Sequence, residues 1–111
     1  MQISFHKVAL KKRFPLAISR GVRYHSENVF IRYEKEGIVG WGEAAPGETE
    51  GADTPEAVQQ ALEQFIATGI DEVSIHALYN RARQLQIPPC AYVGLDIALW
   101  DWTAKKAGMP L

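Results

Sequence analysis

Two arginines three positions apart are the residues of this sequence best suited to bind a small molecule. Arg20 and Arg23 lie in the segment 11–25, which carries five lysines and arginines and no acidic residue. Pro15 and Gly21 argue against regular structure there, so the segment is predicted to be a loop. A guanidinium can bind a carboxylate through two hydrogen bonds, which suits an acidic substrate. Spacing alone still favours the alternative, a solvated loop whose arginines pair with nearby carboxylates.

Three carboxylates stand where they could serve as an acid or a base. Glu43 is near the end of a glycine-rich stretch, and Asp96 and Asp101 interrupt an otherwise apolar one. Asp101 can pair with Lys105 one helical turn later. Asp96 needs a partner, because an unpaired buried charge is costly. We interpret all three carboxylates as structural.

No complete catalytic or metal site is found in the sequence. The three histidines lack metal-ligand spacing, and Gly40 and Gly42 lack the third glycine of a phosphate-binding loop. The acidic residues of the segment 46–53 lack the alternating oxygen donors of a calcium loop. The single cysteine, Cys90, has apolar neighbours and is predicted to be a small buried hydrophobic residue.

Net charge, cysteine count and length limit the partners, the compartment and the number of domains to expect. A net charge of −1 gives no reason to expect nucleic acid or a membrane as partner. A single cysteine fits a reducing compartment, and the N-terminus has no cationic leader before an apolar run. We therefore predict a cytoplasmic protein. A length of 111 residues fits one domain.

Three strands are predicted to position these residues. Alternation and turn signals place them over 2–10, 28–35 and 38–44. The side chains expected to face the core from the second strand are Val29, Ile31 and Tyr33. Gly37 is expected to form a hairpin turn at positive φ. The alternate glycines at 40 and 42 predict the close approach of another element.

Three helices are predicted to follow the strands. The first begins with Thr54 as N-cap and Pro55 at N1, or with Asp53 as N-cap and Glu56 closing a capping box, and it ends by Gly69. The second spans about 74–85. Its inward residues are predicted to be Ile75, Leu78, Tyr79, Ala82 and Leu85.

The last helix, over 91–107, is apolar almost all the way round. Such a helix must be buried, so even the side formed by Val93, Ile97, Trp100 and Ala104 is expected to be covered. Gly108 can take the left-handed position after the helix. Strands followed by helices indicate an α+β domain, here a three-stranded antiparallel meander followed by a three-helix bundle.

Two strings resemble a known family. The sequences GIVGWGEAAP at 37–46 and LDIALWDWTAKKAGMPL at 95–111 resemble the N-terminal capping domain of the enolase superfamily, in the mandelate racemase and muconate lactonizing enzyme branch. The string FPLAISRGVR at 14–23 resembles the matching loop of dipeptide epimerases such as L-Ala-D/L-Glu epimerase. The resemblance implies that residues 1–111 form a cap for a (β/α)₇β barrel. That barrel would carry the Mg²⁺ ligands and the bases that abstract a proton α to a carboxylate.

The resemblance also implies which residues meet the substrate. Two cap loops, at about 14–25 and 45–53, would close over the barrel and exclude water. Arg23 matches an arginine that binds a substrate carboxylate in some dipeptide epimerases. The substrate-contacting residues implied in this chain are Arg23, Arg20, Ile18, Thr49 and Glu50.

The expected function is therefore that of a substrate-specificity cap. The implied enzyme is a Mg²⁺-dependent racemase or epimerase acting on a dipeptide by α-proton abstraction. The alternatives are the cap of an o-succinylbenzoate synthase or a muconate cycloisomerase, or a stand-alone anion-binding module. Nothing up to Leu111 matches the catalytic bases or metal ligands, so we expect this chain alone to bind no Mg²⁺ and to be inactive. The expected partners are a small carboxylate substrate and the barrel, with neither nucleic acid nor membrane, and the parent enzyme is expected to be a homo-oligomer.

Overall fold

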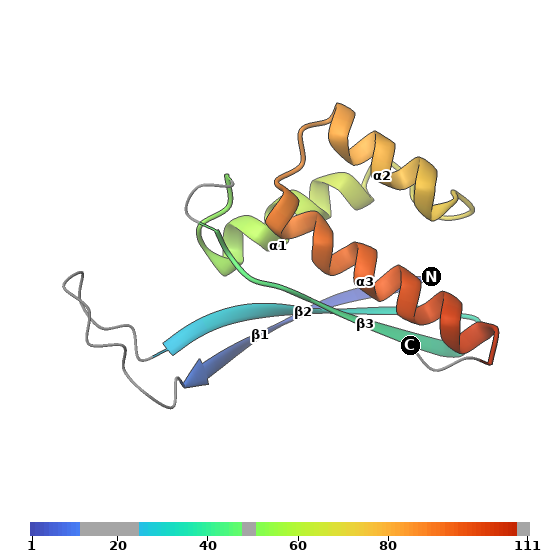
Figure 1. The fold of residues 1–111 in the computed structure, drawn as a ribbon, viewed down its shortest axis with the longest axis horizontal. Coiled ribbons are helices and arrows are strands. Elements are labelled where there is room, and N and C mark those ends of the chain that lie inside the picture. The colour runs from blue at the N-terminus through green and yellow to red at the C-terminus, as the bar shows by residue number, and fades with distance from the viewer. Residues whose placement is uncertain (12–24, 48–50, 109–111) are drawn as a thin grey trace.

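The computed structural model describes residues 1–11, 25–47 and 51–108, which form a sheet with helices on one of its faces (Figure 1). The strands are β1 (Gln2–Lys11), β2 (His25–Lys35) and β3 (Ile38–Ala44), all antiparallel, in the order β1-β2-β3. The predicted meander is therefore confirmed. β2 begins three residues earlier than predicted and pairs with β1 as far as Lys11 opposite His25.

The turn between β2 and β3 has the geometry that the sequence predicts. Glu36 and Gly37 both have positive φ, at 56° and 74°. Two central residues with positive φ match the right-handed twist of the flanking strands, as in type I′ hairpins. The register that follows places Val29, Ile31 and Tyr33 on one face of the sheet, where all three are buried.

The helices are α1 (Pro55–Ile66), α2 (Ile75–Gln84) and α3 (Pro89–Lys106). The sequence allowed either Thr54 or Asp53 as the N-cap of α1. In the structure the N-cap is Thr54, whose side chain accepts a hydrogen bond from the Ala57 N–H at 3.0 Å. Ser74 caps α2 in the same way. Gly108 follows α3 with φ at 76°, as predicted.

The two glycines of β3 allow α3 to lie directly on the sheet. A Cβ at Gly42 would collide with the Gly94 carbonyl oxygen and lie 2.8 Å from the Ala98 nitrogen. A Cβ at Gly40 would collide with the Ala98 carbonyl oxygen. Real Cβ atoms are not found so close to backbone, so the predicted close approach is confirmed and its partner is α3.

The core lies between the sheet and the helices. The largest fully buried side chains come from β2 and all three helices, and they are Phe65, Ile31, Leu62, Leu78, Leu95, Val29 and Val58. Phe65 of α1 meets Tyr92 of α3 edge to face, with ring centroids 5.6 Å apart. Cys90 is buried, as predicted.

The prediction that α3 is covered on all sides is wrong for its outer face. Val93, Ile97 and Trp100 are 44%, 40% and 50% exposed, although Ala104 is buried. The reason is the architecture: α3 packs on the sheet with one side and against α1 and α2 with another. No further described element lies over its third side (Figure 1).

The inward side of α2 is also narrower than predicted. Leu78 and Ala82 are buried, but Tyr79 and Leu85 are about half exposed. Tyr79 lies one position off the line through Leu78 and Ala82, and Leu85 is the C-cap that follows the last residue of α2.

Candidate functional site

The residues predicted to contact substrate lie outside the described part of the chain. Ile18, Arg20 and Arg23 fall in 12–24, and Thr49 and Glu50 fall in 48–50. The residues that flank each of these two segments belong to the described part of the chain. Lys11 and His25 are paired in the β1–β2 ladder, so the first segment begins and ends at neighbouring positions.

The second segment is closed at its base. Gly47 and Ala52 form an antiparallel bridge, in which the Gly47 N–H donates to the Ala52 carbonyl oxygen at 2.8 Å. The Sγ of Cys90 donates to the same carbonyl oxygen at 3.6 Å. The first turn of α3 therefore holds this stem. The end of β1, the start of β2 and the end of β3 lie side by side, because the three strands are antiparallel neighbours. Both segments therefore leave from one end of the domain.

A shallow hollow lies at that end. It has a volume of about 510 Å³ and lies between the end of β3 and the start of α3. Glu43 and Asn28 line it, and the Asn28 side-chain amide donates to the Glu43 carboxylate at 2.7 Å. Glu43 thus has a partner within the sheet, in agreement with its structural interpretation.

Asp101 holds α3 to the edge of the sheet. Its carboxylate lies 2.9 Å from the Lys105 ammonium and accepts the backbone N–H of Trp41 at 2.8 Å. Burial alone would raise the pKa of Asp101, but the hydrogen bonds from Lys105 and Trp41 outweigh it and the pKa is lowered. The predicted pairing with Lys105 is confirmed.

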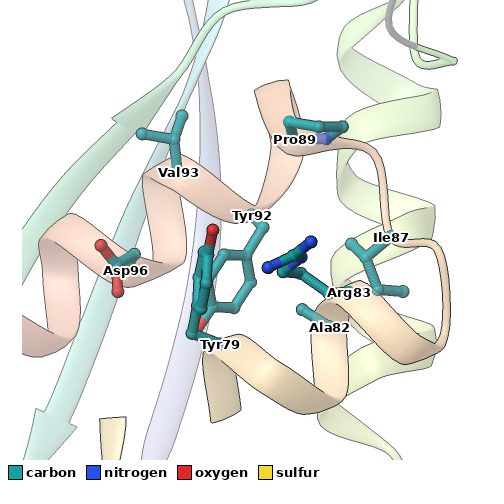
Figure 2. A pocket seen from close by; sticks show the side chains of 8 residues that line it. All are labelled: Tyr79, Ala82, Arg83, Ile87, Pro89, Tyr92, Val93 and Asp96. Carbon is teal, nitrogen blue, oxygen red and sulfur yellow. The ribbon is translucent and has the colours of Figure 1, made fainter. Parts of the chain in front are cut away.

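A second hollow is a groove of about 310 Å³ between α2 and α3 (Figure 2). Its walls are mainly apolar, and its residues are Tyr79, Ala82, Arg83, Ile87, Pro89, Tyr92, Val93 and Asp96. The groove was not predicted from the sequence, because Tyr79 and Val93 were expected to lie inside the core. Their half-exposed side chains instead line an open surface.

Two polar groups in the groove are poorly satisfied. The hydroxyl of Tyr92 is buried and has no hydrogen-bond partner among the described residues. Burial, and then the nearby charge of Asp96, raise the pKa of Tyr92 to about 12. Burial also raises the pKa of Asp96, against a weaker opposing hydrogen bond from Trp100. Asp96 has no ion pair with any described cation.

The described residues do not fit a metal centre. In the ranges 1–11, 25–47 and 51–108, no three side chains of His, Cys, Asp or Glu come together as a metal ion would require. No described helix is long and apolar enough to cross a membrane.

The sequence from residue 1 to residue 111 matches the family described as mandelate racemase / muconate lactonizing enzyme, N-terminal domain. The chain belongs to this family. The fold agrees, since a dipeptide epimerase from Enterococcus faecalis V583, solved with Mg and the dipeptide L-Leu-L-Tyr, superposes with a TM-score of 0.80. That structure is 24% identical, and the match covers 96% of this chain and 31% of the other.

Two relatives are much closer in sequence. A hydrophobic dipeptide epimerase from Flavobacteria bacterium (strain MS024-2A) is 72% identical over 111 residues, and one from Roseobacter litoralis is 53% identical over 111 residues. Each match covers 100% of this chain and 32% of the relative. The chain thus spans about a third of the length of these curated relatives.

Proposed function

We propose that residues 1–111 form the N-terminal cap of a dipeptide epimerase whose substrates are hydrophobic dipeptides. The observation that carries this proposal is the 72% identity, across the whole chain, to a protein of that name. The matched region includes both segments expected to reach the substrate. The proposal narrows the expectation from the sequence, which left the class of dipeptide open.

The reaction would invert one α-carbon of the dipeptide. A base removes the proton α to a carboxylate, and a proton returns to the opposite face of the planar intermediate. The barrel of the longer protein would supply the bases and the Mg²⁺ that stabilises the negative charge. The cap would exclude water and select the side chains of the substrate.

The cap residues proposed to contact the dipeptide remain Arg23, Arg20, Ile18, Thr49 and Glu50. A hydrophobic dipeptide has no side-chain carboxylate, so Arg23 would bind the terminal carboxylate through its guanidinium. Ile18 would contact an apolar substrate side chain. The described stems support this arrangement, because the segments 12–24 and 48–50 leave the same end of the domain.

The longer enzyme is proposed to be a cytoplasmic homo-oligomer. Residues 1–111 contain a single cysteine, Cys90, and so low a cysteine content fits a reducing compartment.

The test is isotope exchange with the complete encoded protein. The protein is incubated with MgCl₂ in D₂O and with L-Leu-L-Tyr or L-Ala-L-Glu, and deuterium at each α-carbon is followed by mass spectrometry and NMR. We expect exchange with inversion, faster for L-Leu-L-Tyr. Preference for L-Ala-L-Glu would overturn the substrate class. No exchange in any dipeptide would overturn the epimerase, and o-succinylbenzoate synthase, muconate cycloisomerase and anion-binding assays would follow.

A further inference from the structure

The sheet narrows from three strands to two at the end of the domain from which the segments 12–24 and 48–50 leave. The last pair of the β2–β3 ladder is Val29 opposite Ala44, so the first residues of β2 pair with β1 alone. Beyond Ala44 the chain turns away towards α1, while β1 and β2 continue side by side (Figure 1). The two segments therefore leave from separate supports, one from the β1–β2 ladder and the other from the closed stem after β3.

One side-chain hydrogen bond spans the gap between these two supports. The Asn28 side-chain amide donates to the Oε2 atom of Glu43 at 2.7 Å. Glu43 stands opposite Phe30 in the ladder, so Asn28 is its diagonal neighbour on the same face of the sheet, within reach of a long side chain. Among the described residues, no backbone hydrogen bond joins the start of β2, 25–28, to the stem residues 45–47. The link across the gap is therefore made by side chains.

The other contacts of the stem hold it from a different side. The Gly47 N–H donates to the Ala52 carbonyl oxygen and closes the stem, and the Sγ of Cys90 in α3 donates to the same oxygen. These contacts fix the shape of the stem and attach it to α3. They do not attach it to the start of β2, so the distance between those two supports depends on the hydrogen bond between Asn28 and Glu43.

We propose that Asn28 and Glu43 are positioning residues for the dipeptide site, which they serve by holding the stem at a fixed distance from the start of β2. The inference rests on the proposed function, because it takes the segments that leave these supports to be the ones that contact the dipeptide. Neither side chain touches the substrate. Without the hydrogen bond, the arrangement that binds the dipeptide is only a fraction of the population, and the apparent dissociation constant rises as that fraction falls.

Kinetics of the complete encoded protein with MgCl₂ and L-Leu-L-Tyr test the proposal. We expect Glu43→Ala to raise KM about fivefold, the weight of one exposed hydrogen bond, and to leave kcat unchanged, because the catalytic bases lie outside the cap. A merely structural role would lower the urea midpoint and the amount of active enzyme, and so kcat, at constant KM. That result would overturn the proposal.

Glu43→Gln separates the hydrogen bond from the charge. The glutamine side chain keeps an oxygen that can accept the Asn28 amide, so KM should stay within about twofold of the unaltered protein. If Glu43→Gln raises KM as much as Glu43→Ala does, the negative charge itself is required, as in a direct contact with the ammonium group of the dipeptide. The proposal would then be wrong.

Exchanging the two side-chain types gives a rescue experiment. Asn28→Asp places a second carboxylate beside Glu43, and the repulsion between them should raise KM at least as much as Glu43→Ala does. Adding Glu43→Gln to Asn28→Asp restores one amide and one carboxylate with the direction of the hydrogen bond reversed. We expect the double variant to recover KM to within about twofold of the unaltered protein. A double variant no better than Asn28→Asp would contradict the proposal.

The ion pair between Arg32 and Glu34 is the matched control. Both residues lie on the same face of β2 as Asn28, nearer the β2–β3 turn and away from the two segments. Their side chains are 33% and 35% exposed and lie 2.9 Å apart. We expect Glu34→Ala to leave KM unchanged. A rise as large as that caused by Glu43→Ala would show that any broken pair on this face has the effect, and the proposal would fail.

A distance measurement separates this inference from the proposed function, because it needs no activity. Spin labels are attached to cysteines introduced at the exposed positions Glu27 and Asp53, one beside each support, while the native Cys90 is buried. We expect Glu43→Ala to broaden the distribution of distances between the labels, and Glu34→Ala to leave it unchanged. Broadening in a protein without epimerase activity would leave the positioning pair standing and refute the proposed function. An unchanged distribution in an active epimerase would leave the function standing and refute the pair.

Discussion

Replacing Gly42 by alanine places a methyl group against the backbone of α3. The new Cβ would collide with the Gly94 carbonyl oxygen and lie 2.8 Å from the Ala98 nitrogen. Ordinary van der Waals contact requires at least 3.4 Å. These neighbours are backbone atoms, so no rotation of a side chain relieves the contact. The whole helix must move away from β3 instead.

The loss of stability follows from this movement of α3 away from β3. Overpacking of a core costs about 1–3 kcal/mol and sometimes more. Because α3 also carries Leu95 and Tyr92 into the core, we expect Gly42→Ala to lower the free energy of unfolding by about 3 kcal/mol, at the upper end of that range. For a domain of this size the melting temperature should fall by about 10 °C or more.

Gly69→Ala is the matched control. A Cβ at Gly69 meets nothing within 4 Å, but φ is 87°, so the substitution tests backbone strain alone. Left-handed backbone costs an alanine about 1–2 kcal/mol. Urea denaturation followed by tryptophan fluorescence measures both variants. If Gly42→Ala costs no more than Gly69→Ala, α3 does not lie on β3 as closely as described here.

Three further predictions concern the helices and the proposed site. Trp102→Ala removes an indole that donates to the Lys35 carbonyl oxygen at 2.9 Å and meets Tyr33 edge to face, so it should lower the free energy of unfolding by about 3 kcal/mol. Trp100 is half exposed, so Trp100→Ala should lower the free energy of unfolding of residues 1–111 by less than about 1 kcal/mol, and urea midpoints compare the two variants. Asp101→Asn should lower the free energy of unfolding at pH 7, because the folded pKa of Asp101 is lowered, and the stability that this gives is present above the unfolded pKa and lost as pH falls through the folded pKa. Asp96 has a raised folded pKa and therefore destabilises the domain as pH rises, so Asp96→Asn should raise the free energy of unfolding of residues 1–111 at pH 7. Melting curves from pH 3 to 8 would show whether either sign is wrong. Arg23→Ala should lower kcat/KM of the complete enzyme for L-Leu-L-Tyr without changing its urea midpoint, and an unchanged kcat/KM would remove Arg23 from the substrate site.

Features fixed by local chemistry could be predicted from the sequence. Glycine at 37 permits a turn that most residues resist, and alternate glycines at 40 and 42 leave a strand face bare enough for a helix. The choice between Thr54 and Asp53 as N-cap could not be made, since both residues can cap and only the geometry selects Thr54.

The outer face of α3 could not be predicted for a different reason. A helix that is apolar all round indicates that every side is covered, but the pattern does not say what covers it. The sheet, α1 and α2 cover two sides, and Val93, Ile97 and Trp100 remain exposed. The groove beside them depends on how α2 leans against α3, a property of tertiary packing that has no local signal. Arg20, Arg23 and the other proposed substrate contacts stay predictions, because they lie outside the described residues.

Whether this protein is a dipeptide epimerase is decided by α-proton exchange, measured with the complete encoded protein in D₂O. We expect L-Leu-L-Tyr to gain deuterium at one α-carbon, with inversion there, and to do so faster than L-Ala-L-Glu. If the protein is folded and supplied with Mg²⁺ but leaves both dipeptides unlabelled, it is not a dipeptide epimerase of this class.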